Sequence, residues 1–435
     1  MTGVTFYSGL KEIGGTVVAV ETEEAVCIFD FGFANVSRLD EDIRLRKGLE
    51  AYDYVKLGIL NAIDGIYEKE VSDKLGVKAF GENGKDTFVI ISHMHIDHMG
   101  GLGALAPELP VYMSTGSATL YHELGVMGEL EIREHENVKP IDFDASVTVG
   151  DIKVTCVPVD HDVVGACGFL IETKEGKICY TGDYRFHGFH PEVSSSFAEK
   201  CKGADIMISE GVTISFADVD VLSLEGPERD NSEWTLLEKV KEEAAVRDGL
   251  IVINNYNRNV ERLHMMIDSL KGKRTFALDK VQADLVAAFY PEDEFCIYLP
   301  EGGSVEEPLI RDKQVVTRAE IMDNASAFIL QQDYRDSYEL FDLAPCISTY
   351  LHMDGAPLGD YDPAFNKFYS LLDQTGIEYE RCGLGGHAEP YYLRKTVDEI
   401  APKILIPLHS FRPEQLKSKM AGQIILPEEG DVIQL

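Results

Sequence analysis

Four potential metal ligands, His93, His95, Asp97 and His98, lie within a single short segment of the chain. They follow the apolar, β-branched run 87–92, so they begin where a predicted strand gives way to a loop. Two histidines spaced by one residue on an extended segment project to the same side, so His93 and His95 could bind one ion. Asp97 and His98, which follow at the turn, could bind a second ion. Imidazole and carboxylate ligands favour zinc, with manganese or iron as alternatives. A histidine-rich surface loop is a much rarer explanation for this spacing.

Two metal ions need more ligands than these four residues supply, and other predicted strands are also followed by single His or Asp residues. Loops at the carboxyl ends of strands are where α/β proteins place their sites. Taken singly, each residue is more simply explained as a core or turn residue, but their shared position favours one common site. They are His161 after 152–159, Asp183 after 177–181, His409 after 403–408 and Asp30 after 25–29. The Asp183 carboxylate could bridge both ions.

The elements that must position these residues change in character along the chain. In the N-terminal part, the runs 16–20 and 25–29 predict a hairpin, and the charged segment 40–60 predicts a surface helix. After about residue 211, strands alternate with helices of about ten residues, which is typical of a parallel, doubly wound sheet. The chain closes with a further strand near 376, a helix after Pro390 and strands at 404–408 and 431–435. The sequence therefore predicts one α/β unit inserted into another.

Composition limits the classes of protein. A chain of 435 residues with a 45% apolar content allows two domains or one large domain with an insertion. We find no apolar run long enough to span a bilayer and no signal peptide, so we expect a cytoplasmic protein without membrane association. The eight cysteines form no Cys-x-x-Cys pair, which indicates buried thiols in a reducing compartment.

The net charge of −35 opposes nonspecific binding to nucleic acid. Two segments, 258–274 and 394–419, are locally basic and could form either binding patches or solvated helix faces.

The motif His93-Met-His-Ile-Asp-His98, with later single His, Asp and His residues, resembles the metallo-β-lactamase family. The resemblance implies an α/β fold, a metallo-β-lactamase αββα sandwich, and a pair of metal ions. Its implied ligands are His93, His95 and His161 for one ion, Asp97, His98 and His409 for the other, and Asp183 bridging both. Asp30 matches the family's first acidic position, which supports the ligand loop from outside the ligand set.

Further segments resemble ribonuclease J and its relatives, enzymes of the β-CASP group. They are Gly9–Gly15, Val159–Ala166, Tyr180–Phe186 and Glu429–Ile433. This resemblance implies an inserted β-CASP parallel α/β domain. The implied boundaries are 1–210 for the N-terminal part of the metallo-β-lactamase domain, 211–375 for the insertion and 376–435 for the C-terminal part.

The same resemblance suggests catalytic roles for Asp97, His387 and Glu210. Asp97 would orient a hydroxide or accept its proton, and Glu210 would orient a site histidine. His387, after a Gly-rich turn, would contact a phosphate oxygen or protonate the leaving group, although a capping or core histidine is the simpler alternative. Weaker candidates for substrate contact are Gly386, Arg258 and Asn259, and for the last two a helix cap and surface charge are almost as good an explanation.

Three departures from ribonuclease J stand out. Gly385 replaces the usual Ser before Gly-His-Ala, and the loop Tyr350–Gly355 lacks the Ser-rich, phosphate-contacting pattern. The chain ends at Leu435, so we expect a short form without the additional C-terminal domain. Dependence on a 5′-phosphate, the cutting mode and a homodimeric assembly are left open by these differences.

Three functional hypotheses follow. The favoured one is a hydrolase with two Zn²⁺ ions, or Mn²⁺, that cleaves phosphodiester bonds in single-stranded RNA. The second is a hydrolase of a small ester, lactone or phosphodiester, which the charge of −35 favours. The third is a metal-stabilised binding protein without turnover, against which the presence of a second ligand set argues.

Overall fold

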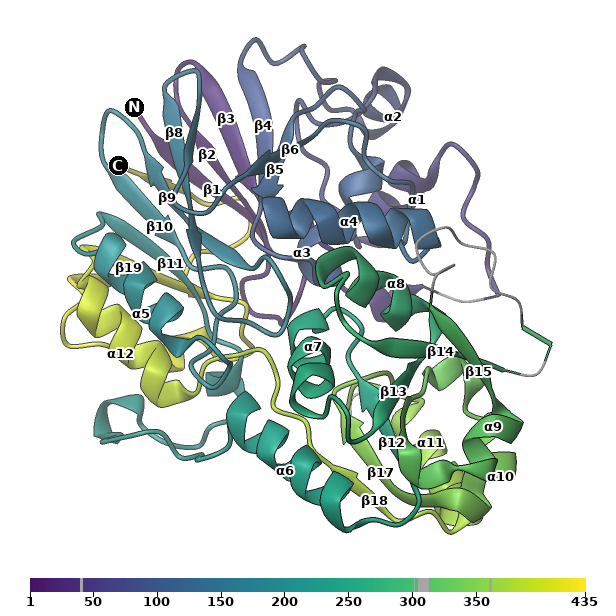
Figure 1. Cartoon of the computed structure of the whole chain (residues 1–435). Coiled ribbons are helices and arrows are strands. Elements are labelled where there is room, and N and C mark those ends of the chain that lie inside the picture. The colour runs from purple at the N-terminus through teal and green to yellow at the C-terminus, as the bar shows by residue number, and fades with distance from the viewer. Residues whose placement is uncertain (40–41, 301, 304–312, 360–361) are drawn as a thin grey trace. The chain divides into compact units, whose positions relative to one another are not determined.

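Two stretches of chain that are far apart in sequence, 1–230 and 386–435, fold together as unit 1, and residues 231–385 form unit 2. This computed structural model describes residues 1–39, 42–300, 302–303, 313–359 and 362–435 (Figure 1). The units change at 230/231 and 385/386, whereas the sequence placed the boundaries at 210/211 and 375/376.

The first sheet of unit 1 contains both ends of the chain. Its strand order is β21-β1-β2-β3-β4-β5-β6. The bounds are β1 (Gly3–Ser8), β2 (Val17–Glu21), β3 (Ala25–Phe29), β4 (Asp86–Ile91), β5 (Val111–Ser114), β6 (Val138–Ile141) and β21 (Val432–Gln434). The antiparallel β2–β3 pair is the predicted hairpin, and β3 through β6 are parallel. The last strand, β21, pairs with the first, β1.

The second sheet of unit 1 also incorporates the C-terminal segment. Its order is β20-β19-β11-β10-β9-β8-β7. The bounds are β7 (Ser146–Val149), β8 (Ile152–Pro158), β9 (Cys167–Glu172), β10 (Lys177–Tyr180), β11 (Ile206–Glu210), β19 (Ile404–Leu408) and β20 (Gln423–Ile424). Strand β19 returns from beyond unit 2 in sequence and pairs in parallel with β11.

Alternating side chains pack the two sheets against each other and against helices. In β11, Ile206 and Ile208 join the core between the sheets, whereas Met207 joins the core beneath the helices. On that outer face lie α5 (Pro191–Lys200) and α12 (Pro390–Ile400), side by side in Figure 1. On the other sheet, α4 (Thr115–Met127) packs against β5 and β6. The predicted αββα sandwich is confirmed.

The predicted helix over residues 40–60 is wrong in extent. The structure has α1 only at Glu50–Leu57, and positions 40–41 lie outside the described residues. Gly58 adopts a left-handed φ of 69° and caps the helix, and Gly48 has a φ of 77° before it. These two glycines favour termination, because other residues adopt a positive φ only at a cost. The remaining short helices of this region are α2 (Lys69–Leu75) and α3 (Ile96–Met99).

Unit 2 is built on a seven-stranded sheet in the order β15-β14-β13-β16-β12-β17-β18, with every recorded pair parallel. The strands are β12 (Leu250–Asn255), β13 (Thr275–Leu278), β14 (Phe295–Leu299), β15 (Gln314–Thr317), β16 (Phe328–Gln331), β17 (Ile347–Met353) and β18 (Tyr379–Arg381). The helices are α6 (Glu233–Val246), α7 (Val260–Ser269), α8 (Lys280–Phe289), α9 (Arg318–Asp323), α10 (Glu339–Leu343) and α11 (Phe365–Thr375). The predicted parallel α/β arrangement is confirmed, although α6, α9, β14 and β15 were not predicted.

Two further features bear on the sequence predictions: the state of the cysteines and the apolar character of the helices. All eight cysteines are free thiols, and six of them are buried. In the described part of the chain, no helix combines the length and the apolar character that crossing a membrane requires.

A fully buried ion pair links two helices of unit 2. Arg262 of α7 donates from Nε and Nη2 to the carboxylate of Glu233 at the start of α6, both at 2.8 Å. Its Nη1 donates to the Met353 carbonyl at 2.9 Å. Arg262 Nη2 also lies 3.3 Å from the partly exposed carboxylate of Asp354. Arg262 and Glu233 are almost completely shielded from solvent, so replacing Arg262 removes the counter-charge of a buried carboxylate.

We therefore expect Arg262→Met to lower the free energy of unfolding of unit 2 by about 3–5 kcal/mol. The double variant Arg262→Met/Glu233→Gln should recover much of that loss, because no unpaired charge stays buried. Urea unfolding followed by circular dichroism measures both. A single variant that is no less stable than the double variant would contradict this account.

Candidate metal centre

The predicted ligands leave the strands of both sheets of unit 1 at the same edge. His93 and His95 follow β4, His161 follows β8, Asp183 follows β10 and His409 follows β19. Helix α3 begins at Ile96 and carries Asp97 and His98. The structure thus brings together ligand-type residues that are separated by more than 300 positions in the sequence.

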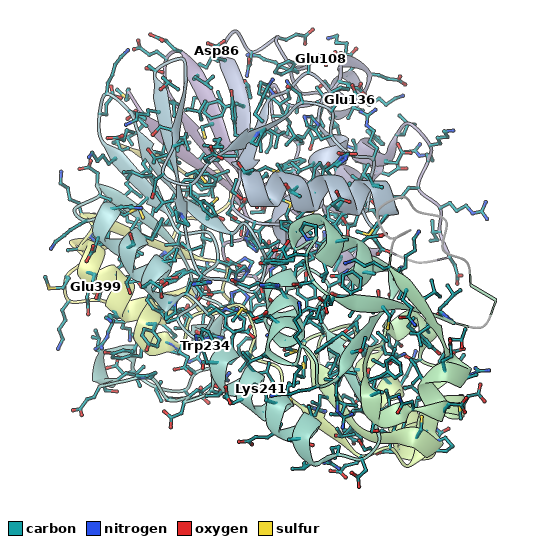
Figure 2. The ribbon with its side chains drawn as sticks, in the orientation of Figure 1. Asp86, Glu108, Glu136, Trp234, Lys241 and Glu399 are labelled. Atoms are coloured by element: carbon teal, nitrogen blue, oxygen red, sulfur yellow. The ribbon has the colours of Figure 1, made fainter. Side chains whose placement is uncertain are left out.

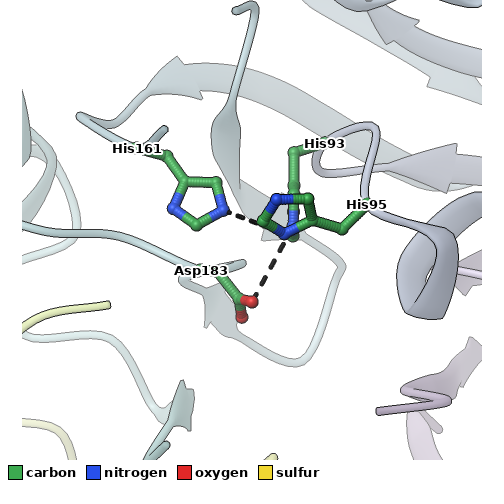
Figure 3. A group of neighbouring side chains, drawn as sticks. All are labelled: His93, His95, His161 and Asp183. Atoms are coloured by element: carbon green, nitrogen blue, oxygen red, sulfur yellow. Dashed lines mark hydrogen bonds and ion pairs between the residues drawn. The ribbon is translucent and has the colours of Figure 1, made fainter. Parts of the chain in front are cut away.

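Three histidines and one aspartate form the first cluster, with ligand atoms within 4.8 Å of one another. His95 Nδ1 lies 3.1 Å from His93 Nε2 and 3.3 Å from His161 Nε2. Asp183 Oδ2 lies 3.7 Å from His93 Nε2. Figure 3 shows these side chains converging from separate loops. The facing atoms are therefore Nε2 of His93 and His161, and Nδ1 of His95.

A second cluster, Asp97, His98 and His409, shares the carboxylate of Asp183 with the first. Asp183 Oδ2 lies 3.2 Å from His98 Nε2 and 3.5 Å from His409 Nε2. Asp97 Oδ2 lies 3.7 Å and 3.5 Å from the same two nitrogens. Because one oxygen of Asp183 faces histidines of both clusters, this carboxylate is placed between them.

The outward-facing nitrogens of three histidines have hydrogen-bond partners, and for His161 the partner fixes which nitrogen carries the proton. His161 Nδ1 donates to the Gly386 carbonyl at 2.5 Å, which leaves a lone pair on Nε2 toward the cluster. His93 Nδ1 lies 3.0 Å from the Ser92 hydroxyl. His409 Nδ1 lies 3.1 Å from the Thr16 hydroxyl, and the backbone N–H of Gly14 donates to it at 3.3 Å.

Asp30 supports the ligand loop from beneath. Its carboxylate accepts from the Ser92 backbone N–H at 2.7 Å, the Ser92 hydroxyl at 2.8 Å, His98 Nδ1 at 2.8 Å and the Tyr180 hydroxyl. Asp30 and His409 are two of the few non-glycine residues with a left-handed backbone, at φ 59° and 53°. Such strain is characteristic of functional sites whose surroundings hold it in place.

The donor set fits divalent cations. Among the described residues, His98 Nε2 and Asp183 Oδ2 are fully buried side-chain atoms without a hydrogen-bond partner. Buried polar atoms without partners are costly, and a cation between them would compensate that cost. Three imidazoles with a carboxylate, and two imidazoles with two carboxylates, are donor sets that suit zinc and related ions.

Protonation differs within the clusters. Burial lowers the pKa of His95 to about 3 and that of His93 well below its usual value, so both imidazoles are neutral at neutral pH. Burial acts in the same direction on His98, but the carboxylates of Asp183, Asp97 and Asp30 outweigh it and raise its pKa well above the usual value. For Asp97, burial is outweighed by the neighbouring His98 and His409, so its pKa is lowered.

His387 and Glu210 lie next to Asp183. His387 Nδ1 is 3.4 Å from Glu210 Oε1 and 3.7 Å from Asp183 Oδ2. Burial would lower the pKa of His387, but Glu210 and Asp183 outweigh it and raise the pKa to about 9. Glu210, the last residue of β11, is itself fixed by the backbone N–H of Val212, which donates to Oε2 at 2.9 Å. His387, Asp183 and His409 also form a third group with ligand geometry.

The structure describes the surroundings of the three residues suggested as substrate contacts, whose contact with substrate stays a prediction. The Gly386 carbonyl binds His161, and a side chain on Gly386 would collide with that imidazole, whose Cε1 lies 2.3 Å from the position of a Cβ. In unit 2, Asn259 caps α7 by accepting from the Arg262 backbone N–H at 3.2 Å, and Arg258 is buried. For Asn259 the alternative of a helix cap is the one observed.

Sequence reasoning missed several residues that contact the ligands. Asp162 lies 3.4 Å from His95 Nε2 and 3.3 Å from His161 Nε2, and Ser92, Thr16 and Tyr180 hold other histidines or Asp30. The signal for Asp162 was present as a second carboxylate flanking His161 in Asp160-His-Asp162. The hydroxyl contacts carry no comparable pattern in the sequence.

The chain is similar to several known proteins. A family model described as "Beta-lactamase superfamily domain" matches residues 81–220. Ribonuclease J 1 of Streptococcus pyogenes is 22% identical and aligns with 100% of this chain and 74% of its own length. Ribonuclease J of Helicobacter pylori strain J99 is 21% identical over 99% of this chain and 60% of its own length. The chain is a ribonuclease J-like protein of the metallo-β-lactamase fold.

A solved structure resembles the whole ribonuclease J-like chain. It is a protein of unknown function from Enterococcus faecalis V583, with 29% identity, a TM-score of 0.84 and coverage of 100% of both chains. The chain spans about three quarters of the length of the Streptococcus relative and less than two thirds of the length of the Helicobacter one.

The raised pKa of His98 leads to a pH prediction for cation binding. His98 Nδ1 donates to Asp30, so the proton that a cation must displace is the one on Nε2. Because His98 binds this proton tightly, Zn²⁺ affinity should rise with pH while His98 is protonated, by about tenfold per pH unit for one displaced proton. Competition with a chromophoric chelator between about pH 6 and about pH 8 measures the slope.

The control is His122→Gln, because His122 pairs with Glu134 on the surface at 3.0 Å and should not alter the slope. Calorimetry in two buffers of different ionisation enthalpy should report the released proton directly. A Zn²⁺ affinity that does not change with pH would refute the assignment.

Proposed function

We propose that this protein is a metal-dependent phosphodiester hydrolase with two bound cations, most simply Zn²⁺, and a ribonuclease J-like nuclease acting on single-stranded RNA. The observation that carries the proposal is the pair of ligand clusters joined by Asp183, in a chain that aligns along its full length with a ribonuclease J. Unit 2, with its parallel sheet, corresponds in this proposal to the β-CASP insertion. A cytoplasmic location and a homodimer remain predictions.

Two divalent cations, when bound, would supply Lewis acidity and lower the pKa of a water at the site. Asp97 is the chain's own group for managing that water. Its lowered pKa keeps it ionised at neutral pH, and its side chain is 25% exposed while the neighbouring histidines are fully buried. An ionised carboxylate open to solvent can accept a hydrogen bond from the attacking water and hold it in line with phosphorus.

His387 is suited to the opposite task. With a pKa of about 9 it carries a proton at neutral pH, and its side chain is 23% exposed. Glu210 holds Nδ1, so Nε2 is left for the substrate and can donate to a phosphoryl oxygen or protonate the leaving 3′ oxygen. Glu210 acts in this scheme as a positioning residue.

Surface charge and the altered loops favour a second candidate. The chain carries 75 acidic against 40 basic residues, and Figure 2 shows acidic side chains such as Asp86, Glu108 and Glu399 projecting outward. In addition, Arg262 and Arg274 of the predicted basic segment 258–274 are buried and bonded within unit 2. A hydrolase of a small ester, lactone or phosphodiester would not need to overcome repulsion between this surface and a polyanion.

The deciding experiment compares substrates with the metal content measured. We expect the protein to cleave 5′-monophosphorylated or 5′-hydroxyl single-stranded RNA, and Asp97→Ala to lower the rate by at least about 10³-fold. The matched control is Asp86→Ala, an exposed carboxylate at the start of β4, which should retain activity. Turnover only of a generic phosphodiester or lactone would instead establish the second candidate, and metal binding without any turnover would establish a binding protein.

A second prediction separates the proton donor from the ligands. His387→Gln should lower kcat for RNA by about 10²–10⁴-fold, because general acid catalysis contributes on that scale. Its metal content should stay at the wild-type value, measured by plasma mass spectrometry after dialysis. Loss of one metal equivalent would show that His387 acts as a ligand in the third group and not as an acid.

A further inference from the structure

The orientation of His95 sets it apart from the other histidines of the first cluster. His93 and His161 face the cluster with Nε2, whereas His95 faces it with Nδ1. Its Nε2 therefore points away from the cluster. In a neutral imidazole only one nitrogen has a lone pair, so His95 can act as a ligand through Nδ1 only when the proton is on Nε2.

The atom that faces this nitrogen is a carboxylate oxygen. Asp162 Oδ1 lies 3.4 Å from His95 Nε2, is buried, and has no hydrogen-bond partner among the described residues. The same oxygen lies 3.3 Å from His161 Nε2. That nitrogen has a lone pair, because His161 donates from Nδ1 to the Gly386 carbonyl, so it cannot donate to Asp162. The N–H of His95, at 3.4 Å, can donate to this carboxylate.

We propose that Asp162 is a positioning residue for the metal centre, which accepts the Nε2–H of His95 and so holds its Nδ1 lone pair toward the first cluster. Histidine ligands in proteins commonly donate their second N–H to a carboxylate or a carbonyl, which fixes the tautomer and raises ligand basicity. Asp30 does this for His98 at 2.8 Å, and Gly386 does it for His161 at 2.5 Å. Asp162 completes the set for His95.

This role rests on the proposed function only in that both require cations at these clusters. The proposal implies that the carboxylate of Asp162, which flanks His161 in the sequence, acts on a different histidine, His95, 67 positions earlier. It also explains why Gly386 must lack a side chain, because a Cβ there would lie 2.5 Å from Asp162 Oδ1 as well as against His161.

The test measures metal binding by the full chain without reference to RNA. The purified protein is stripped with a chelator and titrated with Zn²⁺ against a chromophoric competitor. Asp162→Ala should weaken binding of one of two Zn²⁺ equivalents by about 10–100-fold and leave the second equivalent unchanged. Asp162→Asn should lose less, because its amide oxygen still accepts the Nε2–H. With Co²⁺ as the probe, the visible absorption spectrum of Asp162→Ala should differ from that of the wild type.

The matched control is Asp293→Ala in unit 2. Asp293 is equally buried, at 7% exposure for both residues, and accepts from His264 Nδ1 at 2.9 Å, in a carboxylate–histidine pair outside every cluster with ligand geometry in the described chain. It should not change Zn²⁺ affinity or the Co²⁺ spectrum. Circular dichroism of the stripped variants verifies folding, and if Asp162→Ala does not fold, Asp162→Asn decides the question.

Two results would overturn the proposal. If both Zn²⁺ equivalents bind Asp162→Ala and Asp162→Asn as tightly as the wild type, Asp162 does not position His95. If Asp162→Ala binds only one equivalent, Asp162 is itself a ligand. The reduced affinity is expected whether or not RNA is cleaved, so failure of the ribonuclease assay and failure of this proposal are separate outcomes.

Discussion

A single buried carboxylate, that of Asp30, links the framework of unit 1 to its site. It accepts hydrogen bonds from the ligand loop at Ser92, from His98 on α3 and from Tyr180 on the opposite sheet. A buried carboxylate is costly unless its oxygen atoms accept hydrogen bonds, so the positions of these three elements depend on one another. The left-handed backbone at Asp30 is the cost of aiming the side chain at all of them.

The same principle of satisfied partners extends outward from the clusters. Carbonyl, hydroxyl and carboxylate groups surround the outer nitrogens of the histidines, so the inner nitrogens are directed toward a common region before any cation binds. Such preorganisation lowers the free energy needed to assemble a metal site. It also concentrates charge, because Asp183 is held ionised between histidines of both clusters despite complete burial.

The convergence of the candidate ligands and the α/β architecture could be predicted from sequence, because the candidates share a position at strand ends and the sheets follow from the pattern of apolar runs. His93, His161 and Asp183 follow apolar runs whose end is visible in the sequence, and a parallel sheet is indicated by the alternation of strands and helices. Contacts that depend on rotamer and backbone direction were not accessible. Whether Asp162 faces His161, its neighbour, or the more distant His95 depends on how two loops meet, and no periodicity encodes that.

Other errors have local causes. The helix expected over residues 40–60 is limited to Glu50–Leu57, because Gly48 and Gly58 on either side adopt left-handed backbone conformations. The prediction followed the charge pattern and overlooked these two glycines. Strand β15 was missed because only Val316 among its residues is buried, so an edge strand of this kind has no alternation to detect. The structure also shows contacts that the types of Gly386 and Asn259 did not reveal: the Gly386 carbonyl accepts from His161 and Asn259 caps α7, while their contact with substrate stays a prediction.

The return of the chain from unit 2 to β19 has a consequence for biosynthesis. A nascent chain emerges from the ribosome with its N-terminus first, and domains fold largely as units while synthesis continues. His93, His95, Asp97 and His98 are made early, but His409 and the parallel partner of β11 appear only after the 155 residues of unit 2 have been translated. Until then, the second cluster lacks a ligand and the edge of β11 has no partner. The order of synthesis thus keeps this centre incomplete until residue 409 has been made.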